Sequence, residues 1–513
     1  MPETGIRKWI ITFTLVFATL MQLLDVTVVN VALPHIMGNL GISFDNVGWV
    51  ITAYSIAIIM ILPISGWLGK RFGRKNYFMA SVFLFTLASF FCGHASNIEE
   101  LIIFRFIQGI AGGGMAPTAQ AILIETWPSE ELGMAMAMFG MGAVLGPLVG
   151  PVLGGYITVH FSWRWCFYIN IPMCIVALFL ITTFITPTPK EKRKPVDWPG
   201  LILLATTVLS FQIVLERGET EDWFDTTYII VLAFTAAISL ILFIWQELRT
   251  AFPVVNLRIF RIRSFSVGMV LRLFFGLGLV GSTFVYPLLF QNLLGFSAQQ
   301  TGLVTAPSAI VTIAMMPIVG TLMKKKMPLP LLIFFGIIFF FIFCLLMGKT
   351  TLSFGMGNFL WPLIIRGFGL SMLFVPITTI AVKDLRGDEI GQGTGLNSVM
   401  QQLGGSIGIA LITTFVDHRR AFHRSVLSEN VNDYNPALGM RIQGMTAKFM
   451  ELGHSHLEAY HMAFKAIKGT VLRQSILMSY TDVFWVVGIF FLCLIPLLLF
   501  IKSNKRTPDT SFN

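Results

Sequence analysis

The chain has 513 residues, of which 55% are hydrophobic and only 12% are charged, and its mean hydropathy is +0.76. An ordinary soluble domain carries about 25% charged residues, so this composition excludes a soluble globular protein and indicates that lipid surrounds most of the chain. The formal net charge of +10 at pH 7 does not indicate a nucleic-acid partner, because basic loops on one face of a membrane account for it.

The apolar residues occur in runs long enough to cross a bilayer, for which about 20 residues of helix are needed. The first run is expected to be retained as a membrane helix, because no small-residue cleavage site follows it. In chain order, the predicted spans are 9–33, 47–68, 77–95, 99–122, 134–158, 164–186, 199–215, 227–247, 266–289, 301–323, 330–348, 358–382, 391–416 and 482–501. We therefore expect an all-α polytopic membrane protein with fourteen spans.

Lysine and arginine are unevenly divided between the two sides of these spans. With the N-terminus in the cytoplasm, the inner loops hold 22 of them and the short outer loops hold three. The positive-inside rule therefore places both termini in the cytoplasm. A long outer segment, 417–481, separates the last two spans, and its apolar spacing predicts a helix over 446–477.

Two short motifs recur at nearly one displacement, which indicates an internal repeat. The run 63–70 (Pro-Ile-x-Gly-x-Leu-x-Lys) returns over 317–324, 254 residues on, and glycines of the fifth span return in the thirteenth, 258 residues on. Spans 1–6 thus map onto spans 9–14. We expect an N-terminal six-helix bundle (1–186), an inserted linker with two membrane helices (187–265) and a C-terminal six-helix bundle (266–513) that includes the outer segment. Such repeats are typical of secondary transporters.

Two charged residues stand out inside the spans. Asp25 lies in the first span and Arg105 in the fourth, and an intramembrane charge is a functional candidate by default. With a rise of 1.5 Å per residue, Asp25 lies about 24 Å from the inner edge and Arg105 about 9 Å from the outer edge. In a core about 30 Å thick these depths agree, so we expect the two side chains to meet and Asp25 to exchange a proton. An Asp satisfied by neighbouring groups in a purely structural role is the alternative.

Glycines and cations form two conformational motifs. The loop after the second span contains Gly66, Lys70, Arg71, Gly73 and Arg74; its glycines permit a tight turn, and its cations suit helix C-terminal carbonyls or a carboxylate on another helix. Plain membrane topology explains the same cations equally well. In the fifth span, four-residue spacing predicts a face for close helix packing, with residues Gly146, Pro147, Gly150, Pro151, Gly154 and Gly155.

Polar side chains in the spans supply candidates for a substrate cavity, which combines apolar walls with a few polar groups. An interhelical hydrogen bond explains any one of them about as well. The candidates are Gln22, Asn30, Tyr54, Gln108, Gln120, Arg272, Arg366, Asn397, Gln401 and Gln402. The two arginines favour anionic or amphiphilic substrates.

Metal and nucleotide chemistry are not indicated. The five cysteines fall in or beside apolar runs without paired spacing, which argues against disulfides and a zinc site. His454 and His456 could bind a metal, but solvated surface histidines are the better interpretation. No phosphate-binding loop is present, so ATP-driven chemistry is disfavoured, and neither a metal nor another cofactor is expected.

Together these motifs resemble the major facilitator superfamily. The runs 66–75, 105–109 and 146–155 are similar to its loop, span-4 and span-5 motifs, and the runs 24–34, 163–172 and 256–265 resemble fourteen-span drug:proton antiporters of the EmrB/QacA type. The long outer segment favours the EmrB side. Two departures exist: Gly69 replaces the usual acid of the loop motif, and 391–416 contains no acid, so a second proton site there is not supported.

The resemblance implies efflux of hydrophobic toxic compounds across a bacterial inner membrane, driven by the proton gradient, with Asp25 and Arg105 in coupling. It also implies a periplasmic adaptor and an outer-membrane channel as partners. Export of a specific metabolite, such as a fatty acid or siderophore, is the alternative. A membrane enzyme is disfavoured, because the spans hold no catalytic constellation.

Overall fold

Helices make up almost all of the chain, and no strand occurs in the part that the computed structural model describes, residues 5–42, 44–187, 195–429, 431–432 and 434–501. The α-helices of the N-terminal part and the insertion are α1 (Ile6–Leu40), α2 (Phe44–Ile61), α3 (Ser65–Phe72), α4 (Arg74–His94), α5 (Ile98–Gly113), α6 (Met115–Thr126), α7 (Leu132–His160), α8 (Trp165–Tyr168), α9 (Asn170–Phe184), α10 (Trp198–Arg217) and α11 (Thr227–Arg249). Those that follow are α12 (Arg263–Pro287), α13 (Ala298–Lys324), α14 (Leu329–Met347), α15 (Leu360–Val382), α16 (Asp388–Glu429), α17 (Pro436–Glu451) and α18 (His456–Leu492). Short 3-10 helices are η1 (Ser129–Glu131), η2 (Trp223–Asp225), η3 (Leu257–Arg261), η5 (Met356–Phe359) and η6 (Ile495–Phe500), and η4 (Leu288–Leu293) is a π-helix.

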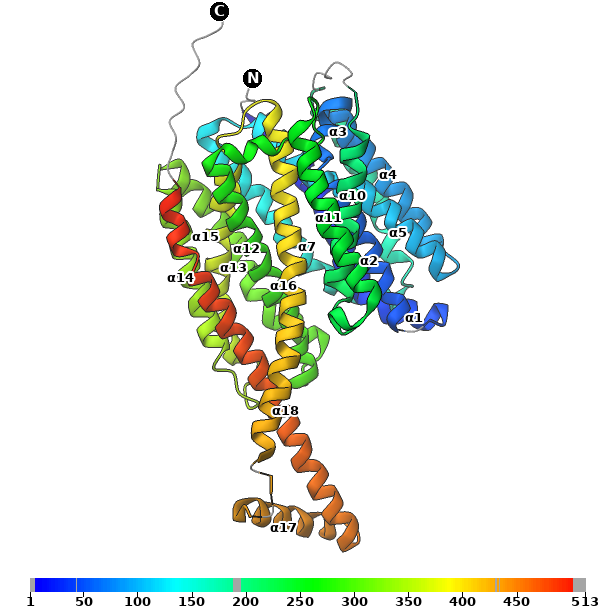
Figure 1. Cartoon of the computed structure of the whole chain (residues 1–513), viewed down its shortest axis with the longest axis vertical. Helices are drawn as coiled ribbons and strands as arrows, with labels where there is room; N and C mark the ends of the chain where they lie inside the picture. The colour runs from blue at the N-terminus through cyan, green and yellow to red at the C-terminus, as the bar shows by residue number, and fades with distance from the viewer. Residues whose placement is uncertain (1–4, 43, 188–194, 430, 433, 502–513) are drawn as a thin grey trace, which may run out of the picture.

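Helices α1 to α9 form one bundle, and α12 to α16 with α18 form a second, with α10 and α11 beside the seam (Figure 1). Helix α10 packs on α2 of the first bundle and on α16 of the second. The Thr52 hydroxyl donates to Glu216 over 2.7 Å, and the Gln212 amide donates to Ser406 over 3.1 Å. The insertion therefore contacts both bundles.

Twelve helices in the described ranges are long and apolar enough to cross a membrane, and a thirteenth span is a pair, 47–61 with 65–72, bent by 60°. The remaining expected span, 99–122, is divided between α5 and α6 at Gly114. A side chain at Gly114 would overlap the Tyr77 hydroxyl, so α4 lies close to the chain at this break. The predicted count of fourteen is therefore not fully confirmed: the described residues contain up to thirteen candidate spans, and the fourteenth expected span is a divided helix.

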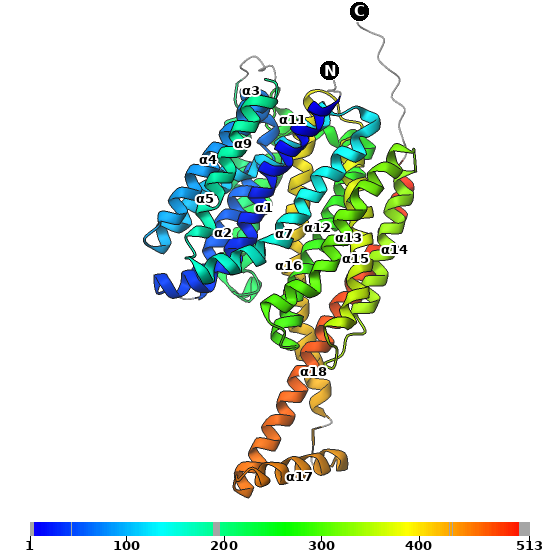
Figure 2. The same ribbon diagram turned by 180° about the vertical axis from the view of Figure 1, so that it is seen from behind.

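The molecule has two distinct ends (Figures 1 and 2). Helix α1 begins and η6 ends at one of them, called here the terminal end, whereas α17 lies at the other, the extension end. Helices α16 and α18, with 42 and 37 residues, continue from the bundle into this extension. The predicted helix over 446–477 is wrong in one respect: it is interrupted after Glu451, because Gly453 has φ 96° and Ser455 starts α18 with a capping box.

The two bundles pack tightly against each other near the terminal end. A Cβ added to Gly66 would overlap the backbone of Gly391, and one added to Gly320 of α13 would lie 3.1 Å from the Gly133 carbonyl of α7. Glu131 accepts hydrogen bonds from Lys324 of the second bundle over 2.8 Å and from Lys8 of the first over 2.5 Å. Close backbone approach and ion pairs therefore join the bundles here.

Helix α7 changes its environment along its length. Near the terminal end it is covered by α13 and α15, whereas in its last turns Val152 and Val159 are 69% and 72% exposed. Pro147 and Pro151 are exposed as well. The side of α7 that faces away from α1 is therefore not covered by other described helices toward the extension end.

The glycine face of α7 packs on α1, as four-residue spacing predicts. A Cβ added to Gly146 would lie 2.7 Å from that of Leu23, one at Gly150 would overlap the Thr27 side chain, and one at Gly154 would lie 3.0 Å from the Val28 carbonyl. Thr27 also donates to the Gly146 carbonyl over 3.3 Å. Gly155, by contrast, has nothing within 4 Å of an added Cβ.

Replacing Gly150 by Ala is therefore expected to destabilise the first bundle by about 1–3 kcal/mol, the usual cost of overpacking. Thermal unfolding of the purified protein in detergent, followed by tryptophan fluorescence, measures the loss. Gly155→Ala is the matched control and should leave the melting temperature unchanged. Equal melting temperatures for the two variants would contradict a tight contact between α1 and α7.

Candidate functional site

The centre of the first bundle holds a buried ion pair. The Arg105 Nη1 atom on α5 lies 2.5 Å from Asp25 Oδ2 on α1, and both residues are 1% exposed. This contact agrees with the depths calculated from the sequence. Because two desolvated charges are stable only when their remaining hydrogen-bonding groups are also satisfied, the neighbours of the pair matter as much as the pair itself.

Two amide side chains donate hydrogen bonds to the second oxygen of the carboxylate. Asp25 Oδ1 accepts from Gln108 Nε2 over 3.0 Å and from Asn170 Nδ2 over 2.7 Å. Both amides also donate to the Ser89 hydroxyl of α4, over 2.7 and 3.3 Å. The cluster of Asp25, Ser89, Arg105, Gln108 and Asn170 thus joins α1, α4, α5 and the start of α9, and we call it the N-half cluster.

The guanidinium of Arg105 is held from its other sides as well. Its Nη1 donates to Gln108 Oε1 over 2.7 Å, and its Nε donates to the Val50 carbonyl of α2 over 3.2 Å. The Tyr54 ring lies 3.9 Å from the guanidinium carbon, a distance typical of cation–π attraction. The cation is therefore fixed in orientation by α2 and α5 together.

Two members of the N-half cluster were not among the residues predicted from the sequence. Asn170 stands in the run 163–172, which resembles the antiporter family, but nothing in the run itself shows that its amide points at Asp25. Ser89 sits in an apolar helix where a lone hydroxyl usually bonds a carbonyl one turn earlier. Neither side chain carries a charge that would single it out.

The loop motif lies at the junction of the bundles near the terminal end. Arg74 forms an ion pair with Glu125 of α6 and donates to the Gly387 carbonyl over 3.3 Å. Gly73 adopts φ 84°, a conformation that glycine favours. Although Gly69 supplies no acid, Glu125 supplies one from another helix, and the Gly387 carbonyl links Arg74 to the second bundle.

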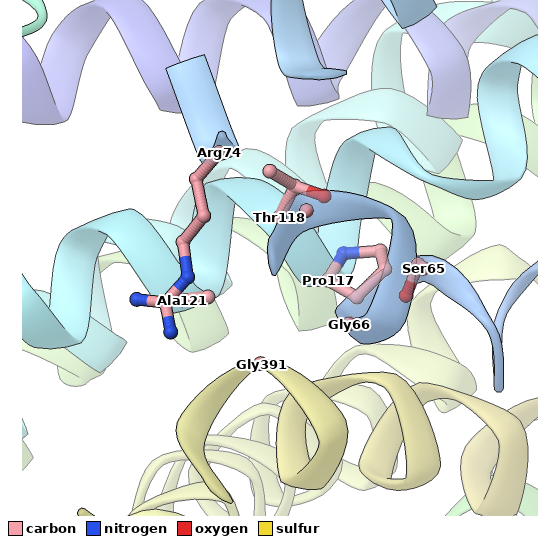
Figure 3. A pocket seen from close by; sticks show the side chains of 8 residues that line it. Ser65, Gly66, Arg74, Pro117, Thr118, Ala121 and Gly391 are labelled. Carbon is pink, nitrogen blue, oxygen red and sulfur yellow. The ribbon is translucent and has the colours of Figure 1, made fainter. Parts of the chain in front are cut away.

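Figure 3 shows Arg74 above a small pocket between this loop, α6 and the start of α16. The pocket holds about 10 Å³, enough for about one water molecule, and Gly391 lies on its far side. It is too small for an organic substrate. The residues Lys70 and Arg71 lie at the end of α3, and Arg71 stacks on the Trp67 ring 5.2 Å away.

The predicted cavity residues do not form a single site. Tyr54 and Gln108 belong to the N-half cluster or contact it, and Asn30 is exposed. Gln120 is buried with its amide 3.6 Å from the Met136 sulfur. The side-chain oxygen of Gln22 and both amide atoms of Asn397 are buried without a hydrogen-bond partner.

Two buried arginines lie in the second bundle. Arg272 of α12 donates to Thr378 over 2.9 Å and to Gln401, and its guanidinium carbon lies 4.7 Å from the Phe374 ring centre. Arg366 of α15 donates to three hydroxyl groups of α12 and α13. Neither forms a salt bridge with any described residue, in contrast to Arg105.

A family model of the Major Facilitator Superfamily matches residues 15–409. The chain is a member of the major facilitator superfamily. It is therefore a membrane transporter rather than an enzyme. Within the superfamily it is 34% identical to the multidrug export protein EmrB of Escherichia coli K12 over 504 residues, which are 98% of this chain and 96% of that protein.

The chain is also similar to a second curated relative and to a solved structure. The fatty acid resistance protein FarB of Neisseria gonorrhoeae is 30% identical over 98% of this chain and 97% of its own length. Among solved structures, the human organic anion transporter MFSD10 aligns with a TM-score of 0.60 at 14% identity, covering 94% of this chain and 99% of that one. At that identity the structural match shows the fold alone.

Removing the Asn170 amide should weaken the N-half cluster. Asn170→Ala deletes a hydrogen bond to a charged group, so we expect the free energy of unfolding to fall by about 1.5–3 kcal/mol. Thermal unfolding in detergent measures this change. Asn76→Ala, which removes an exposed amide bonded to the Phe72 carbonyl, is the matched control, and an equal effect of both substitutions would contradict a special role for Asn170.

Proposed function

We propose that the chain exports hydrophobic toxic compounds from the cell by alternating access, driven by the proton gradient. The similarity to EmrB over nearly the whole chain supports multidrug efflux. The observation that carries proton coupling is the buried N-half cluster, in which a carboxylate with a single cationic partner lies within the membrane-spanning part.

The cluster offers a physical route to coupling. When Asp25 is ionised, Arg105, Gln108 and Asn170 all donate to it. Proton binding removes its charge and leaves Arg105 without a counter-ion, which is costly in a dry site. Protonation therefore favours a different arrangement of α1 and α5, and one proton crossing a potential of 100 mV releases about 2.3 kcal/mol.

We further propose that the terminal end faces the cytoplasm and that the protein lies in a bacterial inner membrane. The excess of lysine and arginine in the loops at that end supports this orientation. In that setting the bundles are closed toward the cytoplasm, and the uncovered part of α7 faces the periplasm. The same orientation places the extension in the periplasm.

The extension is proposed to bind a periplasmic adaptor that leads to an outer-membrane channel. It projects beyond the bundle (Figure 1) and carries exposed apolar side chains, including Met440 and Leu452 (69% and 70% exposed) as well as Leu457. Large apolar side chains exposed outside lipid favour a protein contact when they form one patch. A protein partner therefore fits this surface better than solvent alone.

Export of fatty acids is the second candidate function. The similarity to FarB favours it, as do the two buried arginines of the second bundle. Both functions use the same proton coupling, so they differ only in the substrate.

Asp25→Asn is expected to abolish proton-driven transport while the protein still inserts in the membrane, because the amide cannot exchange a proton. Substrate-induced proton flux into proteoliposomes measures the effect. Asp225→Asn, which alters an exposed carboxylate in η2, should transport like the unaltered protein. Retained flux with an unchanged pH response in Asp25→Asn would rule out the proposed role.

Leu457→Asp should weaken adaptor binding, because it places a charge in the exposed apolar surface of the extension. Co-purification with a coexpressed periplasmic adaptor measures binding, and we expect a loss of about tenfold or more, typical of a central contact residue. Ile6→Asp introduces the same charge at an exposed residue of the terminal end and should have no effect. If both variants retain the adaptor equally, the extension is not its binding surface.

A further inference from the structure

The internal repeat relates Arg366 to Arg105. Arg105 is the eighth residue of α5, and Arg366 is the seventh of the corresponding helix α15. Asp25 is the twentieth residue of α1, and the twentieth residue of the corresponding helix α12 is Ser282. The second bundle therefore keeps the arginine of the N-half cluster and has a serine in place of its carboxylate.

The contacts of Arg366 confirm this correspondence. Its Nη2 donates to Ser282 over 3.2 Å and to Thr283 over 2.9 Å, and its Nη1 donates to Ser308 of α13 over 3.2 Å. The guanidinium carbon lies 5.2 Å from the Tyr286 ring centre; this ring belongs to α12, whereas the Tyr54 ring that faces Arg105 belongs to α2. Hydroxyl groups thus stand where a carboxylate stands in the first bundle.

Hydroxyl groups accept hydrogen bonds from Arg366 but carry no charge, so they do not neutralise its positive charge. Arg366 is 7% exposed, and none of the described acidic side chains forms an ion pair with it. Its Nε and the Tyr286 hydroxyl are both buried without a hydrogen-bond partner. Because an unpaired buried charge is far more costly than a paired one, an anionic group between these atoms would be stabilised.

One residue of the site is exposed. Thr283, whose hydroxyl accepts from Arg366, is exposed, whereas its neighbours Ser282 and Tyr286 are buried. Thr283 lies 11 residues beyond Arg272, three helical turns along the same face of α12. That face is buried at Arg272 and exposed at Thr283. Because Arg366 donates to Thr283, its guanidinium lies close to the surface.

We propose that Arg366, Ser282, Thr283, Ser308 and Tyr286 bind the anionic head group of an amphiphilic substrate. The substrate would supply the carboxylate, or a similar single anionic oxygen group, that the second bundle lacks. Arg366 pairs with its charge, and the Tyr286 hydroxyl, which is buried without a partner, donates to a remaining oxygen lone pair. Ser282 and Thr283 donate to the Leu279 carbonyl and would exchange that acceptor for the head group. This inference rests on the proposed efflux function and names the class of substrate for it.

The repeat suggests a direct test. Ser282→Asp restores the carboxylate of the N-half cluster beside Arg366 and should exclude an anionic ligand. Ser282→Asn has the same shape without the charge and is the matched control. Arg366→Gln removes the cation and should also abolish the preference for anions.

Binding is measured with 1-pyrenebutyrate and 1-pyrenebutanol, which differ in carrying a carboxylate or an alcohol. Energy transfer from tryptophan to pyrene reports binding to the full chain in nanodiscs of zwitterionic lipid, with empty nanodiscs as background. The unaltered protein should bind the carboxylate at least about tenfold more tightly than the alcohol, as a charged hydrogen-bonded contact implies. Ser282→Asn changes a residue of the site without adding a charge, so it should bind the carboxylate more tightly than the alcohol even if its affinity for both probes is lower. Ser282→Asp should lose that preference and keep alcohol binding, which also shows that it is folded.

Two results would overturn the proposal: equal binding of both probes to the unaltered protein, or an unchanged carboxylate preference in Ser282→Asp. A lipid head group is a second source of the same chemistry, so the measurement is repeated with phosphatidylglycerol in the nanodiscs. Displacement of pyrenebutyrate by this lipid would assign the site to lipid and overturn the substrate role; unchanged binding supports it. Proton flux with a neutral substrate is measured separately, so a failure of efflux is distinguishable from a failure of this site.

Discussion

The ion pair between Asp25 and Arg105 is the interaction on which the first bundle depends. Moving an ionised carboxylate and a guanidinium out of water costs several kcal/mol each. Their mutual attraction offsets this cost only if the remaining hydrogen-bonding groups of both side chains also find partners. Here the Gln108 and Asn170 amides complete the carboxylate. Helices α1, α4, α5 and α9 must therefore keep their relative positions for the charges to remain buried.

The glycine face of α7 also helps to hold α1 in position. Thr27, which packs on Gly150, is two residues from Asp25, so the register between α1 and α7 also sets the position of the carboxylate. The bundles meet mainly at the terminal end, through Gly66 with Gly391 and through Glu131 with Lys324. In the proposed proton coupling, a rearrangement of α1 would thus act on α7, which itself contacts the second bundle.

Much of this arrangement could be predicted from the sequence, because lipid imposes simple rules on length and charge. The meeting of Asp25 with Arg105 follows from helical rise, and the repeat and the insertion are predictions from motif spacing. The role of Asn170 does not follow, because a neutral amide at a helix start has many possible partners. The break between α5 and α6 was also missed, since it depends on how closely Tyr77 approaches Gly114. The partner of Arg74 proved to be Glu125, which only the packing of α6 reveals.

The continuous helices α16 and α18 have a mechanical consequence. At 1.5 Å per residue, the 42 residues of α16 form a rod about 63 Å long that starts beside Gly66 and ends in the extension. A rigid rod turns as one body, so a small tilt of the second bundle becomes a larger displacement at the tip. The extension would therefore move in step with the transport cycle, and any protein bound to it would sense which end of the transporter is open.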